Sequence, residues 1–290
     1  GGGVSENPEQ HVHIEQTPGF NIGGARQPAG CTNSLHSHRT AEVFIIHTGS
    51  WRFFWGLNGD DGEVVLNPGD LISLPTHMFR GFENVTPVNA TNETGSGFIF
   101  SVLGGDDSGG GVVWAPEVLE EASNHGLTLL ESGQLVNTRE GEEIPAGMPP
   151  VSPVSKTGLS FHSQNTITDA SKVVVTRPGE WAYRETELIG RSPNAVIREC
   201  PGFEVRRVQW GNGDEIPWRV SNLDTVLISN TGSVVLSGGE TLGAGDVALV
   251  QAGEEEIDVK PLPGGVSELF IVIGTDDPAG ETRLLDGGAE

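Results

Sequence analysis

Cysteine and long apolar runs are both scarce in this sequence, and each shortage excludes a class of protein. Cys31 and Cys200 are the only cysteines in 290 residues, which is too few for a disulfide framework. No apolar stretch approaches the roughly 18 residues that a membrane helix needs. The first residues also lack the charged segment and apolar run of a signal peptide. We therefore expect a cytoplasmic protein with no membrane partner.

Basic residues are scarce as well. Lysine and arginine together number 16 against 40 acidic residues, which gives a formal net charge of −24, and only three of the basic residues are lysine. Such a surface repels nucleic-acid phosphates and anionic lipids. We therefore expect no nucleic-acid partner.

Glycine and proline, in contrast, are frequent, with 42 and 18 residues. This composition is typical of many short strands joined by tight turns. A chain of this length is long enough for two domains that each bury a core.

A pattern of candidate metal ligands lies between Gly30 and Gly49. It reads glycine, five residues, His36-x-His38, three residues, Glu42, six residues and glycine. Side chains two apart in a strand lie on the same face, so His36 and His38 are expected to point the same way. Two histidines and one carboxylate with open coordination positions are typical of non-haem iron(II) oxygenases, although other divalent metals use the same set.

These residues resemble the first motif of the cupin family, G-x5-H-x-H-x3-4-E-x6-G, in which every fixed position is filled here. The second cupin motif, G-x5-P-x-G-x2-H-x3-N, is matched by Gly69, Pro75 and Asn84. However, His77 stands at the position of the family glycine, and Arg80 stands at that of the fourth ligand, normally histidine. A guanidinium group stays protonated and has no lone pair, so Arg80 cannot ligate a metal.

Three interpretations of this departure remain open. In the first, His36, His38 and Glu42 form a three-ligand site, and Arg80 points into the cavity to hold an anionic substrate group. In the second, a rearranged turn brings His77 in as a fourth ligand. In the third, His77 is a turn residue at the barrel rim and Arg80 pairs with a local carboxylate.

The chain also repeats itself. Pro18-Gly19-Phe20 recurs 183 residues later as Pro201-Gly202-Phe203, and FSVLGGDD at 100–107 corresponds to FIVIGTDD at 270–277. A repeat of this length indicates a duplicated domain, and the resemblance is therefore to a bicupin. In the second copy the ligand positions hold Arg219, Ser221 and Thr225, and the fourth falls near Glu256. This copy is expected to be metal-free and structural, with a ligand pocket around Trp218 and Arg219 as the alternative.

The resemblance implies an all-β fold of two tandem cupin-type antiparallel barrels, of the double-stranded β-helix or jelly-roll kind. We predict a metal-binding N-terminal domain at 1–107 and a degenerate C-terminal domain at 161–290. A connector with a short helix and a proline-rich loop is expected at 108–160. A homodimer paired through sheet edges and a monomer with internal pseudo-symmetry both remain open.

The cupin resemblance allows three functions. The first is a non-haem dioxygenase in which His36, His38 and Glu42 hold a divalent ion, with Fe(II) favoured. Glu42 and Arg80 would be its catalytic residues, and Arg80 would neutralise a small aromatic, dicarbonyl or carboxylate substrate. The second is a redox-neutral isomerase, decarboxylase or lyase that uses Zn, Ni or Mn as a Lewis acid. The third is a non-catalytic cupin that binds a small molecule.

Overall fold

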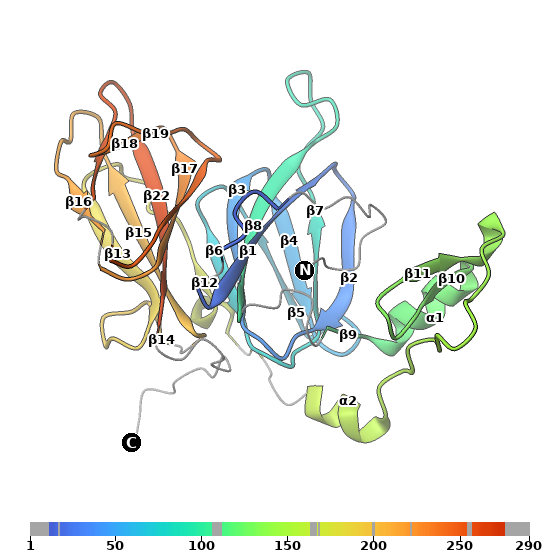
Figure 1. The fold of residues 1–290 in the computed structure, drawn as a ribbon. Helices are drawn as coiled ribbons and strands as arrows, with labels where there is room; N and C mark the ends of the chain where they lie inside the picture. Colours follow the sequence, from blue (N-terminus) through green and yellow to red (C-terminus); the bar gives the residue numbers. More distant parts are fainter. Residues whose placement is uncertain are drawn as a thin grey trace.

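The computed structural model describes residues 12–16, 18–105, 112–162, 167, 169–198, 201–220, 222–253 and 257–275. These residues form two antiparallel β-barrels that lie side by side, with a small helical and hairpin segment beside the first barrel (Figure 1). The predicted all-β fold of two tandem barrels is confirmed.

The first barrel consists of two five-stranded sheets. The first sheet has the order β1 (Phe20–Gln27), β8 (Gly97–Gly104), β3 (Glu42–Thr48), β6 (Leu71–Leu74) and β12 (Val174–Val175). The second sheet has the order β5 (Gly62–Leu66), β4 (Trp51–Trp55), β7 (Arg80–Asn84), β2 (Thr32–Ser37) and β9 (Val113–Trp114). Alternate residues of β4 are buried inside this barrel, where Trp51, Phe53 and Trp55 pack against Phe44 and Phe82.

The second barrel has a six-stranded and a four-stranded sheet. The larger sheet has the order β14 (Ile197–Arg198), β13 (Arg184–Gly190), β15 (Phe203–Trp210), β22 (Ser267–Gly274), β17 (Thr225–Thr231) and β20 (Val247–Val250). The smaller sheet has the order β16 (Trp218–Arg219), β21 (Asp258–Pro261), β18 (Val234–Leu236) and β19 (Thr241–Leu242).

The internal repeat seen in the sequence extends to the strand registers. Val43 pairs with Val102 in the first barrel, and the residues at the equivalent positions, Val226 and Val272, pair in the second. The register also shifts at equivalent points of β3 and β17, so both copies keep the same β-bulge. The two halves of the chain therefore have the same fold although few of their side chains are shared.

The two barrels pack face to face through an apolar layer. Side chains on the outer faces of the five-stranded sheet β1-β8-β3-β6-β12 and the six-stranded sheet form one buried cluster. Residues at equivalent positions of the repeat meet across it, since the rings of Phe20 and Phe203 lie 5.7 Å apart. His47 Nδ1 also lies 3.1 Å from the side-chain oxygen of Asn230, its own equivalent. Contact between equivalent residues is what an approximate two-fold relation between the barrels produces.

A buried polar network accompanies this apolar layer. Its centre is Glu268 on β22, which is fully buried and accepts hydrogen bonds of 2.9 Å from both Gln209 and Asn230. From the same sheet, Arg207 donates to the main-chain oxygens of Gly69 and Thr176, at 3.1 and 3.3 Å. These hydrogen bonds connect the second barrel to the turn that precedes β6 of the first barrel and to the residue that follows β12.

We expect the stability of the protein relative to Glu268→Gln to increase as the pH falls. Burial raises the pKa of Glu268, and the hydrogen bond from Asn230 and the charges of Arg207 and Arg177 oppose this only in part. Because the folded pKa lies above the ordinary value of 4.5, the stability contributed by protonation is fully present below pH 4.5. It is lost as the pH rises from there through the folded pKa, with a slope of at most about 1.4 kcal/mol per pH unit.

Urea unfolding of both proteins between pH 4.5 and pH 8 measures this difference. A difference in unfolding free energy that does not change with pH would show that Glu268 titrates as an ordinary carboxyl.

The connector forms a separate small layer beside the first barrel (Figure 1). It holds α1 (Pro116–Asn124), the hairpin of β10 (Leu127–Leu129) and β11 (Leu135–Asn137), and α2 (Lys156–His162). Pro116 occupies the first turn of α1, as predicted for a short helix there. Val113, Ala115, Val118 and Leu159 pack against Leu35 and Phe79, so the connector covers part of this barrel's outer surface.

Two strands pair with the first barrel although they lie outside the residue range predicted for it. Strand β9 belongs to the predicted connector but pairs with β2 of the first barrel, and His36 lies opposite Trp114. Strand β12 belongs to the predicted C-terminal domain but pairs with β6. The boundaries at 107/108 and 160/161 remain predictions.

Candidate metal centre

The imidazoles of His36 and His38 and the carboxylate of Glu42 lie together inside the first barrel. His36 is in β2, His38 follows the end of that strand, and Glu42 is the first residue of β3. Glu42 Oε2 lies 3.4 Å from His38 Nε2 and 4.0 Å from His36 Nε2. Within the described ranges, these three residues are the one group whose ligand atoms all lie within 4.8 Å of one another. All three side chains are buried.

The protonation of His36 is compatible with a metal ligand. Its Nδ1 lies 2.7 Å from the main-chain oxygen of Ser34, so Nδ1 carries the proton and donates it to that carbonyl. The lone pair is then on Nε2, which is the nitrogen nearer Glu42. A carbonyl that accepts from the remote nitrogen is the usual support of a histidine ligand.

Both imidazoles are neutral near pH 7. Burial lowers the pKa of His36 to about 4, and the charge of Glu42 opposes this only in part. Burial, together with the positive charge of Arg80, lowers the pKa of His38 to about 3. The contacts of Glu42 with the histidines are therefore not ion pairs at this pH, and neutral imidazole is the form that binds metals.

The unpaired atoms of this cluster fit a divalent cation. Glu42 Oε2 is buried and has no hydrogen-bond partner among the described residues, although it faces two imidazole nitrogens. Donor atoms that share one ion at about 2.1 Å lie roughly 3 Å apart in octahedral geometry. The distances of 3.4 and 4.0 Å therefore need only a modest contraction.

Arg80 lies beside this cluster, at the first position of β7. Its side chain is completely buried, Nε lies 3.5 Å from Glu42 Oε2, and Nη1 donates to the main-chain oxygen of Met78 at 3.1 Å. Nε and Nη2 have no hydrogen-bond partner within the part of the chain that the structure describes. Burial lowers the pKa of Arg80, and Glu42 opposes this. Nε therefore forms an ion pair with a local carboxylate, that of Glu42, and Nη2, next to the candidate ligands, is a donor that makes no hydrogen bond with any described residue.

His77 is not part of this group of ligand atoms. Its main-chain N–H donates to the oxygen of His38 at 2.8 Å, and its φ of 62° is in the left-handed region. Such a φ is what a glycine at this position of the cupin motif provides without strain. The turn thus keeps its shape with a histidine, and His77 as a fourth ligand remains a prediction.

The sequence pattern missed one neighbour of the candidate centre. The Trp114 ring lies 5.4 Å from that of His36, and Trp114 comes from β9, 78 positions further along the chain. In the sequence, Trp114 stands directly before Ala115-Pro116, where α1 starts. This local context does not indicate that β9 pairs with β2.

The second barrel has a different side-chain set at the equivalent positions. Arg219 donates to Asp258 at 2.9 Å and is exposed, and the Thr225 hydroxyl donates to the oxygen of Leu223 at 2.7 Å. The other two positions, Ser221 and Glu256, lie outside the described residues. Neither of the two described side chains is a metal ligand of the histidine or carboxylate type.

The fold and the candidate centre together define a class: a double-barrel β-protein of the jelly-roll type, with candidate metal ligands inside one barrel. No protein-family model matches the sequence, and no curated protein matches it. Among solved structures, procruciferin, the 11S globulin of Brassica napus, is similar at 12% identity and a TM-score of 0.53. The match covers 93% of this chain and 79% of that one.

Two oxalate decarboxylases are similar to the same degree. The formate complex from Lactobacillus farciminis has 14% identity and a TM-score of 0.52, and the match covers 91% of this chain and 79% of that one. The Bacillus subtilis structure at pH 4.6 has 15% identity and a TM-score of 0.51, covering 92% and 70%. At such identities the likeness shows the fold: this chain has the bicupin fold that its sequence motifs predicted. Among the described residues, the helices are too short or too polar to cross a bilayer.

Proposed function

We propose that this protein is a divalent-metal-dependent bicupin enzyme that acts on a small carboxylate substrate in its first barrel. The observation that carries this proposal is the buried group of His36, His38 and Glu42, with the guanidinium group of Arg80 beside it, whose Nε and Nη2 make no hydrogen bond within the described ranges. These residues would hold one divalent ion, which supplies a Lewis acid for a substrate oxygen when bound.

Charge balance supports an anionic substrate. Glu42 and Arg80 carry opposite charges and cancel in a buried site, so a divalent ion leaves the site with an excess of positive charge. Uncompensated buried charge is costly, and a substrate carboxylate would neutralise it. The Nε and Nη2 donors of Arg80 match the two oxygens of a carboxylate.

The reaction class we favour is redox-neutral, with decarboxylation of a small dicarboxylate first. Several of the similar structures are oxalate decarboxylases, and one of these concerns the Mn(II) centres of the Bacillus subtilis enzyme, so manganese is the first ion to test. In this chain His36 and His38 stay neutral near pH 7, which suits them as ligands and not as proton donors.

A dioxygenase is the second candidate. Its support is the donor set, since two histidines and one carboxylate leave coordination positions open, as in non-haem iron oxygenases. Such an enzyme would use Fe(II) and a small aromatic or dicarbonyl substrate bound through Arg80. A non-catalytic binding cupin remains the third. Cytoplasmic localisation and a homodimer remain predictions.

Release of carbon dioxide and uptake of oxygen separate these candidates. The protein, loaded with Mn(II) or with Fe(II), is incubated with oxalate, malonate, 2-oxo acids and small aromatic acids. We expect carbon dioxide without stoichiometric oxygen uptake with a small dicarboxylate. Oxygen uptake in step with substrate loss would favour the dioxygenase, and no turnover with either ion would leave the binding protein.

A further inference from the structure

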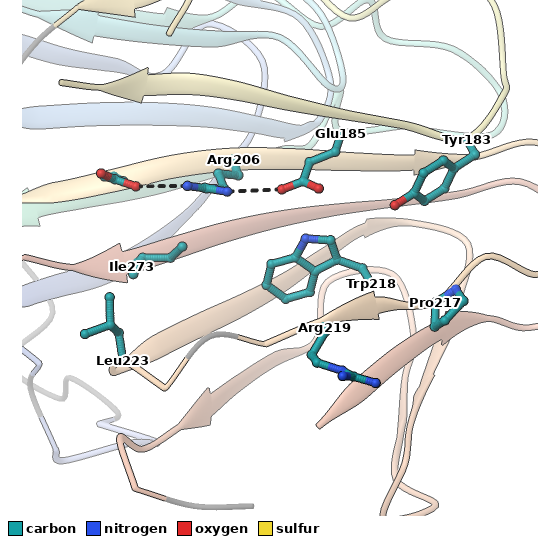
Figure 2. Close-up of a pocket in the computed structure, with 9 residues that line it drawn as sticks. Tyr183, Glu185, Arg206, Pro217, Trp218, Arg219, Leu223 and Ile273 are labelled. Carbon is teal, nitrogen blue, oxygen red and sulfur yellow. Dashed lines mark hydrogen bonds and ion pairs between the residues drawn. The ribbon is translucent and has the colours of Figure 1, made fainter. Parts of the chain in front are cut away.

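A cavity of about 370 Å³ opens inside the second barrel, away from the candidate metal centre (Figure 2). Its polar lining includes Tyr183, Glu185, Glu204, Arg206 and Arg219. Along β15, Glu204 and Arg206 alternate with Val205, which belongs to the layer between the barrels. The cavity therefore lies on the inner face of β15. Its volume is at the small end of the range of about 300–1,000 Å³ that ligand pockets cover.

The charged groups around this cavity are paired with one another. Arg206 donates from Nη1 to Glu185 at 3.2 Å and from Nη2 to Glu204 at 3.4 Å, so one guanidinium group links both carboxylates (Figure 2). Arg219 at the rim adds a positive charge, and its Nε donates to Asp258 at 2.9 Å. The lining holds two arginines and two glutamates, and the carboxylate of Asp258 beside it adds one further negative charge, so a neutral ligand is favoured over an anionic one.

Donors and acceptors are both available in the lining. Arg206 Nε is buried and has no hydrogen-bond partner among the residues the structure describes, so it is a donor without an acceptor. Each of the two carboxylates has a second oxygen outside the bond to Arg206, and a carboxylate accepts about four hydrogen bonds. Burial and the charge of Glu185 raise the pKa of Tyr183, which keeps its hydroxyl protonated. A ligand rich in hydroxyl groups matches this mixture, because each hydroxyl both donates and accepts.

Apolar surfaces complete the lining. Trp218 is almost completely buried, and its indole lies across the cavity from the Arg206–Glu185 pair in Figure 2. Leu223 and Ile273 add aliphatic surface at one end. An aromatic ring pairs well with the C–H face of a small ring that carries hydroxyl groups on its edge.

We propose that the second barrel binds a neutral monosaccharide or a similar cyclic polyol in this cavity. The hydroxyl groups of the ligand would bond to Glu185, Glu204 and Arg206, and its apolar face would lie on Trp218. The second barrel would then be a ligand-binding module that has exchanged metal ligands for a sugar-type lining.

Saturation-transfer NMR on the whole protein tests this proposal. The probes are D-glucose, D-galactose, D-mannose, D-xylose and myo-inositol, each at millimolar concentration, with glycine and glucuronate as charged comparisons. We expect ring-proton transfer from at least one neutral probe and weaker transfer from glucuronate. No transfer from any neutral probe, or stronger transfer from a charged one, would overturn the proposal.

A matched pair of variants tests whether the ligand binds in this cavity. Leu223 and Val65 are both 51% exposed, and Leu223 lines the cavity whereas Val65 lies on β5 of the first barrel. Leu223→Trp fills the cavity and is expected to weaken binding by about tenfold or more, while Val65→Trp leaves it unchanged. Equal binding by both variants would place the ligand elsewhere. Glu204→Gln gives a second check at the polar wall, where the expected result is also weaker binding.

Discussion

Replacing His36 and His38 by alanine is expected to remove the divalent ion from the protein. The wild-type chain, reconstituted with Mn(II) or Fe(II) and then desalted, is expected to retain about one ion per chain. The double variant keeps Glu42 as the single remaining candidate ligand. Removing a residue that only hydrogen-bonds to a metal ligand weakens metal affinity about 10–100-fold. The loss of two ligands is therefore expected to weaken metal affinity by more than this. Elemental mass spectrometry on protein without a histidine tag measures the metal content.

His125→Ala is the matched control for the double variant. The His125 imidazole is 59% exposed at the end of α1, far in sequence from the candidate ligands, and its loss removes a histidine without touching the barrel interior. The control is expected to retain the ion. Equal metal content in the control and the double variant would contradict the assignment of the ligands, and so would a wild-type chain that retains no ion after reconstitution.

The barrel fold could be predicted because its determinants repeat along the chain. The glycines at 30 and 49 adopt positive φ angles of 78° and 81°, which turns of this type require, and their spacing fixed the strands between them. The equivalent glycines, Gly213 and Gly232, have φ angles of 88° and 67°. Local turn chemistry of this kind is readable in a sequence because it depends on single residues at fixed spacing.

The proximity of His36, His38 and Glu42 was predictable for a similar reason. His36 and His38 are two residues apart, and Glu42 opens the next strand, so neighbouring segments bring them together. The contacts that depend on distant segments were not predictable. Trp114 reaches His36 through the pairing of β9 with β2, and Glu268 is held by Gln209 and Asn230 from two other strands. No periodicity in the sequence specifies these long-range pairs.

The orientation of Arg80 is the clearest example of a feature that the sequence alone does not determine. The sequence established that a guanidinium group replaces the expected fourth ligand, and it left open whether Arg80 points inward. In the structure the side chain is fully buried beside Glu42. Its orientation follows from the backbone of β7, in which residues 80, 82 and 84 share a face and Phe82 belongs to the barrel interior.

Arg80→Lys is expected to lower kcat/KM for a carboxylate substrate by about 10²–10³-fold, the usual effect of removing one preorganised donor at a reacting group. Lysine keeps the positive charge beside Glu42 but lacks the fork that binds two carboxylate oxygens at once. The metal content is expected to stay at the wild-type level, because Arg80 is not a ligand. Steady-state kinetics on the substrate found in the carbon dioxide assay, together with metal analysis of the same sample, measure both quantities.

Arg52→Lys is the control for this substitution. Arg52 lies on β4 of the same sheet and pairs at 2.7 Å with Glu83 and at 2.9 Å with Glu63, on the solvent side of the barrel. Its replacement likewise exchanges a carboxylate-paired arginine for lysine but leaves the interior intact, so kcat/KM is expected to stay near the wild-type value. If Arg80→Lys lost the ion together with activity, Arg80 would act by holding Glu42 in place, whereas unchanged kinetics would remove it from substrate binding. Only a loss of kcat/KM at constant metal content assigns the guanidinium group of Arg80 to the substrate.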